Sequence, residues 1–366
     1  MRYFLIAGEA SGDLHGRNLV QALQARDPEA AVRFWDSSRM ESVMGYWEVF
    51  LKARAIARNL AACKADIRAW KPDVVILIDY PGFNLKIAEF AHQEGFKVYY
   101  YIAPKVWASR EGRIKKLQAF VDRLFVIFPF EEGYFARHGM PCIYKGNPLV
   151  DVVDRSPALQ ESREAFLQRH GLKDVPYIAL LAGSRTMEIQ SMMPVFMAFA
   201  RAFWARECYA RWRFIIAAPA SRSAKDYQLE GLDAFVHVVS GDTYSVLRHA
   251  RAAVINSGTA SLEAALIGTP QVVCYRVSPL SYQIMRRLIR VPYVSLVNLI
   301  LGRRAVGEYL QNDFTPEKLL AEVRRLVEDE SARSAMLADY AAVRSLLGGS
   351  GATEAIAAAM VAELQG

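Results

Sequence analysis

A short apolar run that ends in a carboxylate constrains this chain more than any other feature. Val74–Ile78 is five apolar strand-forming residues in succession, and Asp79-Tyr80-Pro81-Gly82 follows it directly. An unbroken run of this length is typical of a strand covered on both faces, as in a parallel sheet. Ligands of open α/β sheets bind just outside the carboxyl ends of the strands. The run therefore predicts a parallel sheet and places Asp79 where a catalytic base is useful.

Strand patterns alternate with helical patterns along the whole chain, which indicates βαβ units. In the first half, strands are predicted at Arg2–Ala7, Ala31–Trp35, Val74–Ile78, Lys97–Ile102 and Arg123–Ile127. In the second half, they are predicted at Ile178–Leu181, Arg213–Ala217, Val236–Val239, Ala252–Ile255 and Gln271–Tyr275. Helices are predicted at Gly16–Ala25, at about 43–70, and from about Leu85 and Arg110 onward.

The length of 366 residues exceeds what one hydrophobic core usually supports, so two domains are expected. Gly146-Asn147-Pro148 reads as a junction between residues 1–150 and residues 151–345. Residues 346–366 follow a break at Gly348-Gly349 and form a final helix, which either stays with the second domain or crosses back to the first. The expected fold class is α/β, with two doubly wound, Rossmann-like domains facing each other across a cleft. That is the GT-B arrangement, although paired Rossmann-like halves also occur in other folds.

Composition narrows the classes of partner and compartment. The net charge of +7 favours an anionic partner, but no nucleic-acid recognition motif accompanies it. The four cysteines are scattered singly, which argues against a zinc site or a disulfide framework and suits a reducing cytosol. The amino-terminal residues lack the apolar region of a signal peptide, and no run approaches the roughly 20 apolar residues of a membrane span. A cytoplasmic protein with peripheral membrane contact at most is predicted.

The first strand leads into a glycine-containing turn, Gly8-Glu9-Ala10-Ser11-Gly12-Asp13. Glycines before a helix permit close backbone approach, and a helix N-terminus attracts anions. The spacing differs from the dinucleotide fingerprint GxGxxG, so a nicotinamide or flavin enzyme is disfavoured. A tight strand-to-helix turn without a ligand explains this segment equally well.

Two similar turns lie in the second half, at residues 180–185 and 255–261. Each combines small residues with free N–H groups at a helix start, where a phosphate can bind. Arg185 adds a cation suited to a diphosphate, and Glu263 lies one helical turn further on, as an acceptor for a ribose diol. Ser257 and Thr259 could also be ordinary helix caps. Two such turns in one half, together with Asp79 in the other, favour a nucleotide site.

Neither a metal nor a cofactor is predicted. The chain has no Asp-x-Asp pair, and its six histidines show no metal-ligand spacing.

Two stretches carry apolar residues at helical spacing among basic ones. Residues 43–60 place Val43, Trp47, Phe50, Ala53, Ala57 and Leu60 on one stripe with Lys52, Arg54 and Arg58 nearby. A basic amphipathic helix with aromatic anchors suits a membrane interface, although such stripes more often face a core. Residues 281–301, which include Arg286, Arg287 and Arg290, form a second candidate.

Taken together, several segments resemble the lipid A disaccharide synthase family, in its order and over nearly the whole chain. They are GEASGD (8–13), IDYPGFN (78–84), APKVWAS (103–109), FPFE (128–131), GNP (146–148), LAGSRTMEI (181–189), NSGTASLEAAL (256–266) and YVSLVNLI (293–300). Each segment alone is weakly specific, whereas the combination is specific.

The resemblance implies an inverting, metal-independent GT-B hexosyltransferase at the cytoplasmic face of the inner membrane. Its substrates would be UDP-2,3-diacylglucosamine and 2,3-diacylglucosamine 1-phosphate, joined by a β-1,6 bond with release of UDP. By motif, Asp79 would be the general base, and Ser11 and Glu9 would line the catalytic site. The residues expected to hold UDP are Arg185, Ser257, Gly258, Thr259, Glu263, Arg276 and Asn298. The resemblance leaves a homodimer open.

The chain departs from the family between the strand near Phe34 and Met44-Gly45, where only Asp36–Ser42 joins them and a Gly-rich turn is missing. The shortening bears on acceptor recognition more than on the fold. Two alternatives therefore remain. One is a related UDP-sugar enzyme, either a 2-epimerase or a transferase with another lipid acceptor. The other is a peripheral membrane protein that binds UDP or lipid without turnover.

Overall fold

The computed structural model describes residues 1–36, 53–227, 229, 231–232, 234–278, 282–283 and 291–365. Its contacts divide the chain into two compact units. Unit 1 comprises Met1–Asp151 and Leu347–Gly366, and unit 2 comprises Val152–Leu346. The C-terminal segment therefore belongs to the unit that contains the N-terminus.

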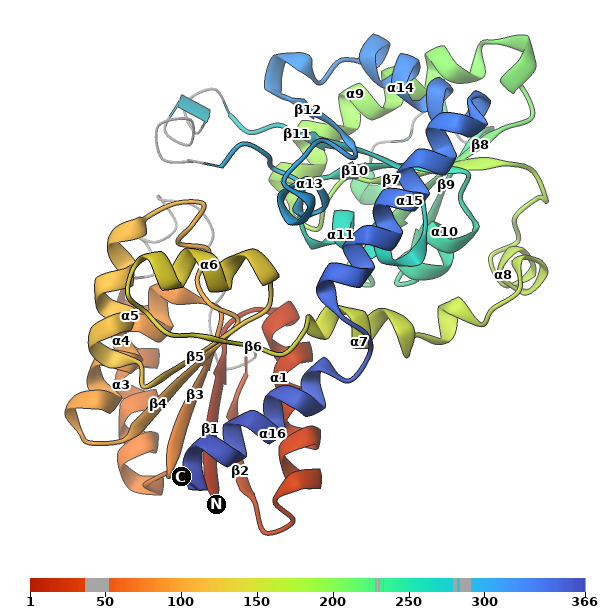
Figure 1. The fold of residues 1–366 in the computed structure, drawn as a ribbon. Coiled ribbons are helices and arrows are strands. Elements are labelled where there is room, and N and C mark those ends of the chain that lie inside the picture. Colours follow the sequence, from red (N-terminus) through yellow and green to blue (C-terminus); the bar gives the residue numbers. More distant parts are fainter. Residues whose placement is uncertain are drawn as a thin grey trace. The chain divides into compact units, whose positions relative to one another are not determined.

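Unit 1 is built on a six-stranded parallel sheet in the order β2-β1-β3-β4-β5-β6 (Figure 1). Its strands are β1 (Arg2–Ala7), β2 (Ala31–Trp35), β3 (Val74–Ile78), β4 (Lys97–Tyr101), β5 (Arg123–Val126) and β6 (Ile143–Tyr144). Its helices are α1 (Ala10–Arg26), α3 (Ala53–Trp70), α4 (Pro81–Gln93), α5 (Ile114–Phe120), α6 (Pro129–Arg137) and α16 (Ala352–Gln365), and α7 (Pro148–Asp154) spans the boundary of the unit.

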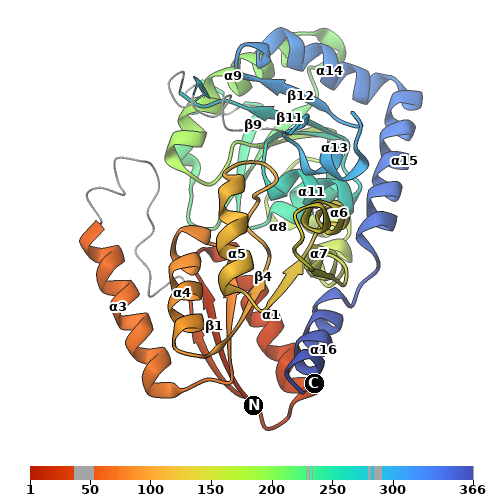
Figure 2. The same cartoon turned by 60° about the vertical axis from the view of Figure 1, so that its left-hand side comes forward.

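Helices cover both faces of this sheet, which is why β3 is apolar at every position. Val75 and Leu77 belong to a core cluster with residues of α3, α4, α5 and α6. Val74, Ile76 and Ile78 belong to a second cluster, with residues of α1 and α16. Figure 2 shows α3, α4 and α5 on one side of the strands and α1 and α16 on the other.

Asp151 attaches the C-terminal helix to unit 1. α15 (Glu330–Leu347) ends at the glycine-rich break that the sequence predicts, and α16 begins at Ala352. The Asp151 carboxylate accepts hydrogen bonds from the N–H groups of Gly351 (2.5 Å) and Thr353 (2.8 Å) and from the Thr353 hydroxyl (2.8 Å). These bonds satisfy N–H groups that a helix start otherwise leaves unpaired.

Unit 2 has a second six-stranded parallel sheet, in the order β12-β11-β10-β7-β8-β9. Its strands are β7 (Tyr177–Leu181), β8 (Arg213–Ala218), β9 (Val236–Ser240), β10 (Ala252–Asn256), β11 (Gln271–Tyr275) and β12 (Gly307–Leu310). Besides α15, its helices are α8 (Arg163–Arg169), α9 (Thr186–Trp204), α10 (Thr243–His249), α11 (Thr259–Ile267), α13 (Leu296–Leu301) and α14 (Pro316–Glu328).

The predicted α/β class with two Rossmann-like units is confirmed, and the differences are local. α1 begins at Ala10 instead of Gly16, and α4 begins at Pro81 instead of Leu85. Pro81 fits the first turn of a helix because the N–H group it lacks has no partner there. Two short edge strands, β6 and β12, escaped prediction. The shortened connection lies outside the described residues from Ser37 onward.

Candidate functional site

The strand order of each sheet reverses between two neighbouring strands, and the predicted motifs follow those strands. In unit 1, β2 lies on one side of β1 and β3 on the other. In unit 2, β7 lies between β10 and β8. Ligands of doubly wound sheets bind at such switch points. The turns after β1 and β3, and those after β7 and β10, therefore occupy the expected binding edge of their own sheets.

The Asp79 turn has a strained backbone. Asp79 (φ 46°) and Tyr80 (φ 45°) are consecutive left-handed residues, and neither is glycine. Such residues each add roughly 1–2 kcal/mol of steric energy, so neighbouring groups must hold them in place. The Asp79 N–H donates to the Tyr101 carbonyl (3.1 Å), and the Asp79 carbonyl accepts from Tyr100 Oη (2.7 Å) and Asn84 Nδ2 (2.8 Å).

Gly8 connects the GEASGD and IDYPGFN motifs. A Cβ built on Gly8 would lie 2.2 Å from Cδ1 and 2.3 Å from Cγ of the Tyr80 ring. Only glycine permits this approach, and the ring of Tyr80 therefore lies directly over the turn after β1. Glu9 and Ser11 are both exposed, at the cap and in the first turn of α1. Both remain predicted members of the catalytic site.

The charges around Asp79 partly cancel. Burial raises the pKa of the Asp79 carboxyl, Lys105 lowers it, and Glu9 raises it again. Burial also raises the pKa of Tyr80, with Glu9 as the second cause. A carboxylate with a raised pKa is a stronger base once it is ionised, as general-base chemistry requires.

A buried carboxyl, Glu131, fixes the loop that carries Lys105. Glu131 accepts from Trp107 Nε1 (2.9 Å) and from the N–H groups of Ile127 (3.1 Å) and Phe128 (2.9 Å). Burial raises the pKa of Glu131 to about 7, and the Trp107 bond is the largest of the effects that oppose it. The APKVWAS and FPFE motifs thus meet in one contact. Sequence reasoning gave neither Glu131 nor Lys105 a role.

In unit 2, Arg185 lies in the turn between β7 and α9. Its side chain is 47% exposed and contacts Glu188 (3.2 Å), whose other oxygen accepts from the N–H groups of Ser184 and Arg185. Gly183 (φ 103°) has no room for a side chain, since a Cβ would lie 2.3 Å from Glu188 Oε2. Arg185 therefore presents its cation to solvent beside a short, glycine-dependent turn.

Arg222 supports the same turn, although the sequence analysis assigned it no role. It donates to the Ser184 carbonyl (3.3 Å) and to Thr186 Oγ1 (2.9 Å), and it is also paired with Asp226. It follows β8 in a segment with no recognisable motif, which explains why sequence reasoning passed over it.

The turn after β10 leaves its backbone open. Gly258 and Thr259 are exposed, and Ser257 is half-buried with its hydroxyl donating to the Val294 carbonyl (3.3 Å). The N-cap of α11 is Gly258, which has no side chain to bond the first N–H groups of the helix. The first N–H groups of α11 are thus available to an anion.

Two residues that were predicted to bind UDP, Asn298 and Arg276, form hydrogen bonds to other groups of unit 2. Asn298 is fully buried; its Nδ2 donates to the Val306 carbonyl (3.0 Å) and to Glu308 (2.8 Å), and its Oδ1 accepts from the N–H groups of Ala305 and Val306. Protein groups thus occupy every bonding position of this amide, and UDP binding by Asn298 stays a prediction. Arg276 donates to the Gln311 (3.2 Å) and Phe314 (2.7 Å) carbonyls; nucleotide binding by Arg276 stays a prediction.

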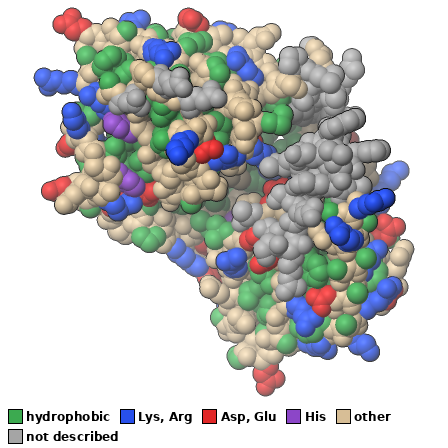
Figure 3. All heavy atoms as spheres, turned by 180° about the vertical axis from the view of Figure 1, so that it is seen from behind, with side chains coloured by type: hydrophobic (Ala, Val, Ile, Leu, Met, Phe, Trp, Pro, Cys, Tyr) green, Lys and Arg blue, Asp and Glu red, His purple; other side chains and the backbone are tan. Residues whose placement is uncertain are grey.

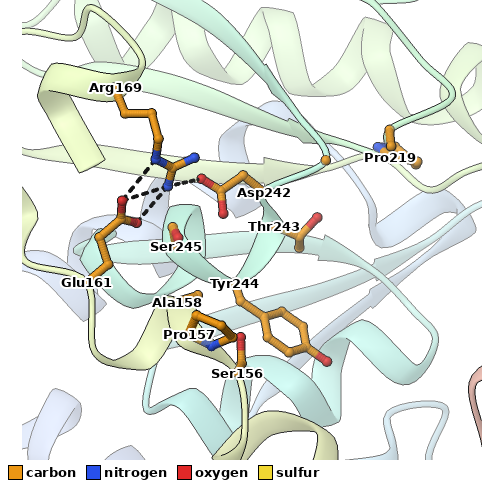
Figure 4. A pocket seen from close by; sticks show the side chains of 12 residues that line it. Ser156, Pro157, Ala158, Glu161, Arg169, Pro219, Asp242, Thr243, Tyr244 and Ser245 are labelled. Carbon is orange, nitrogen blue, oxygen red and sulfur yellow. Dashed lines mark hydrogen bonds and ion pairs between the residues drawn. The ribbon is translucent and has the colours of Figure 1, made fainter. Parts of the chain in front are cut away.

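Glu263 is paired with a tyrosine that lines a cavity of about 820 Å³ in unit 2. Tyr244 Oη donates to Glu263 Oε1 (3.2 Å), and burial raises the pKa of both groups. Figure 4 shows the lining, in which Arg169 is paired with Glu161 and Asp242 while the Tyr244 ring lies apart from these ion pairs. The cavity follows β8 and β9, on the side of β7 away from β10.

Within the described ranges, no group of three or more His, Cys, Asp or Glu side chains is gathered as a metal site.

The predicted membrane stripe is only partly described, because residues 43–52 lie outside the described residues. In its described part, Leu60 packs against the core of unit 1, whereas Arg54 and Arg58 are exposed. Of the second candidate, Arg286, Arg287 and Arg290 also lie outside the described residues. Figure 3 shows basic and acidic side chains interspersed over the visible face.

One helical stretch, Glu330–Gln365, is long and apolar enough by composition to pass for a membrane span. It consists of α15 and α16, which the glycine-rich break separates, and Ile356 and Met360 of α16 are fully buried in unit 1. Its apolar residues thus contribute to a protein core.

Comparison with solved structures shows the class of fold. A UDP-GlcNAc 2-epimerase from Neisseria meningitidis, bound to UDP-GlcNAc, aligns with a TM-score of 0.71 at 11% identity, covering 99% of this chain and 100% of that one. A sucrose-phosphate synthase from Thermosynechococcus elongatus aligns with a TM-score of 0.59 at 14% identity, covering 100% and 99%. At these identities the likeness concerns the fold alone, and the fold is of the GT-B type.

Sequence comparison then gives the family. A family model described as lipid-A-disaccharide synthetase matches residues 3–355. The lipid-A-disaccharide synthase of Syntrophus aciditrophicus is 38% identical over 365 residues, covering 96% of this chain and 94% of the relative. That of Geobacter sulfurreducens is 37% identical over 374 residues, covering 97% and 95%. The chain belongs to the lipid-A-disaccharide synthase family, and it is a glycosyltransferase of lipid A synthesis.

Proposed function

We propose that the chain joins UDP-2,3-diacylglucosamine to 2,3-diacylglucosamine 1-phosphate, with Asp79 as the general base and the turns of unit 2 as the UDP site. The observation that carries this proposal is the Asp79 carboxylate at the switch point of unit 1, held in a strained turn beside the GEASGD motif.

In the proposed reaction, the 6-hydroxyl oxygen of the acceptor attacks C1 of the donor sugar. The new O6–C1 bond forms as the bond from C1 to the β-phosphate oxygen breaks, and the electron pair of that bond leaves with UDP. The hydroxyl proton passes to the Asp79 carboxylate. A sugar hydroxyl is a poor nucleophile, so such proton removal typically contributes about 10²–10⁴-fold to the rate. Glu9 and Ser11 lie on the neighbouring turn and are assigned to acceptor binding.

The UDP leaving group requires positive potential at its diphosphate. Arg185 supplies an exposed guanidinium, and the open N–H groups at the start of α11 supply hydrogen-bond donors. Ser257, Gly258 and Thr259 form the turn that brings the diphosphate to these donors. Charge that develops on a departing phosphate is stabilised most by groups that are already in place.

The uridine half is assigned to the Glu263 side of the same sheet edge. The Glu263 carboxylate accepts the ribose hydroxyls, and Tyr244 holds that carboxylate by its 3.2 Å hydrogen bond. The cavity of about 820 Å³ beside Tyr244 offers space for the base. A pocket of this size falls within the usual range for small-molecule sites, about 300–1,000 Å³.

Both substrates carry acyl chains, so the proposal includes peripheral contact with an anionic leaflet at the cytoplasmic face of the inner membrane. The exposed Arg54 and Arg58 at the start of α3 support this contact. Each basic residue near an anionic surface contributes about 1 kcal/mol, which gives reversible attachment. The proposal also allows a homodimer. Light scattering with and without detergent measures whether the protein is a monomer or a dimer.

The test is the Asp79→Asn variant assayed with both diacyl substrates in mixed micelles. Turnover is expected to fall by about 10²–10⁴-fold while UDP affinity, measured by calorimetry, is unchanged. Asp73→Asn is the matched control, because Asp73 lies at the opposite end of β3, where its carboxylate accepts from the Arg2 N–H (2.7 Å). Near-wild-type turnover of Asp79→Asn removes this residue from the mechanism.

Product analysis also separates the alternatives. Formation of the disaccharide by mass spectrometry excludes a protein that binds without turnover. Conversion of UDP-N-acetylglucosamine to its 2-epimer would favour the epimerase, whose fold the chain shares.

A further inference from the structure

Two buried polar side chains of unit 1, Asn84 and Tyr100, have no role in the reaction as assigned so far. Both are fully buried, and both donate to the backbone of the Asp79 turn. Asn84 Nδ2 donates hydrogen bonds to the carbonyls of both Ile78 (3.1 Å) and Asp79 (2.8 Å). These two residues lie where β3 ends and the left-handed pair Asp79–Tyr80 begins. Tyr100 Oη adds a second bond to the Asp79 carbonyl (2.7 Å).

The Asn84 amide carries an energetic penalty that packing alone does not explain. Its Oδ1 is buried and has no hydrogen-bond partner among the described residues. An unsatisfied buried acceptor destabilises a fold by roughly 1–3 kcal/mol, so an apolar residue at this position would be expected on grounds of stability. The amide instead serves the two carbonyls of the turn.

The bonds from Asn84 and Tyr100 reach only the backbone of Asp79, not its carboxylate. Burial raises the pKa of the Asp79 carboxyl, whereas Lys105 and a hydrogen bond from the Tyr80 N–H lower it. The carbonyl is therefore fixed from inside the sheet while the carboxylate remains available for a substrate. A reacting group that is already oriented in this way does not have to lose conformational entropy when the reaction begins.

We propose that Asn84 and Tyr100 are positioning residues for the transferase reaction: together they fix the left-handed Asp79–Tyr80 turn and so orient the Asp79 carboxylate toward the acceptor hydroxyl. This inference rests on the proposed role of Asp79 as the base. It adds two residues that touch neither substrate and act through the backbone of a third.

The test uses Tyr100→Phe, which removes one hydroxyl and keeps the ring in the core. We expect kcat to fall by about tenfold or more with little change in KM, because misplacement of a reacting group by 1 Å can lower a rate by about 10²-fold. Asn84→Ala is the second variant and is expected to act in the same direction. Tyr3→Phe is the matched control: Tyr3 is a fully buried tyrosine of the same sheet whose hydroxyl donates to Asp27 (3.2 Å) at the opposite edge.

The decisive measurement combines Tyr100→Phe with Asp79→Asn. If Tyr100 acts through the carboxylate, the second substitution adds no further loss of kcat to Asp79→Asn, whereas an unrelated structural defect adds its own loss. Melting temperatures of all variants show whether lost turnover reflects unfolding. Wild-type kcat in Tyr100→Phe and Asn84→Ala, or additive losses in the double variant, overturns the inference. Full activity of Asp79→Asn alone overturns the proposed base instead, so the two failures are distinguishable.

Discussion

Substitution of Gly8 by alanine tests whether the GEASGD motif supports the catalytic turn. The added Cβ would lie 2.3 Å from Tyr80 Cγ, whereas carbon atoms normally approach to about 3.5–4.0 Å. The ring must therefore move by more than about 1 Å to reach an ordinary contact. Rotation of the ring about its own axis does not move Cγ, so the shift must come from the Tyr80 backbone or from its χ1 angle. Both lie next to Asp79.

The expected effect has two parts. Overpacking of this size typically destabilises a fold by about 1–3 kcal/mol. A displacement of the base by 1 Å is expected to lower kcat by about 10²-fold. UDP affinity is expected to stay unchanged, because the proposed nucleotide site belongs to unit 2.

The assay measures disaccharide formation in mixed micelles and the melting temperature of each variant. Gly133→Ala is the control, because Gly133 lies within α6 and the nearest atom to its added Cβ is Arg137 Nη1 at 3.6 Å. Glycine to alanine inside a helix is expected to stabilise by roughly 0.5–1 kcal/mol without loss of activity. In a Tyr80→Ala background, Gly8→Ala should have little further effect. The reasoning is refuted if Gly8→Ala alone keeps wild-type kcat.

Three further predictions concern charges and contacts described above. Lys105→Met removes a cation that favours the ionised form of Asp79, so the pKa of the Asp79 carboxyl should rise and the acid limb of the kcat/KM profile should move to higher pH. Lys86→Met, at an exposed lysine, is the control and should leave the profile unshifted. Tyr244→Phe frees the Glu263 carboxylate and should raise the Kd for UDP about fivefold, as loss of about 1 kcal/mol implies; an unchanged Kd in calorimetry would contradict the assignment of this carboxylate to the ribose. Burial raises the pKa of Glu131 to about 7, so the folded state binds more protons than the unfolded state between about pH 4.5 and 7. The free energy of unfolding should therefore fall as pH rises through this window, which denaturant unfolding at several pH values measures. The same pH dependence in Glu131→Gln would show that Glu131 is not its cause.

The alternation of apolar runs predicted the sheets well because a strand covered on both faces leaves a strong signal. Val74–Ile78 is the clearest case, with identical bounds in sequence and structure. The short edge strands β6 and β12 were missed because two to four residues carry no periodicity. The start of α1 was missed because the glycines of GEASGD favour a turn by local preference. In the structure Gly16 lies in the helix, where a Cβ would meet Phe34 Cζ at 2.5 Å, so tertiary packing determines its presence there.

The candidate site could be located from the sequence where a residue lies in the turn after an apolar strand, as for Asp79 after β3 and Arg185 after β7, and the roles of both stay predictions. It was not predictable where the role depends on neighbours distant in the sequence. For Asn298, only the structure shows the four hydrogen bonds of its buried amide, and UDP binding by this residue stays a prediction. Tyr100 reads as an ordinary strand residue, and only the pairing of β3 with β4 brings its hydroxyl to the Asp79 carbonyl.

The attachment of α16 through Asp151 has a consequence for how the protein is made. A ribosome releases the segment that completes the core of unit 1 only after the whole of unit 2, since α16 supplies Ile356 and Met360 to the cluster that covers β1 and β3. Unit 2, which is continuous in sequence, can fold before that moment. We therefore expect the core of unit 1 to stay partly uncovered while unit 2 is synthesised, and a stop codon shortly before residue 352 to destabilise unit 1 although it leaves unit 2 intact.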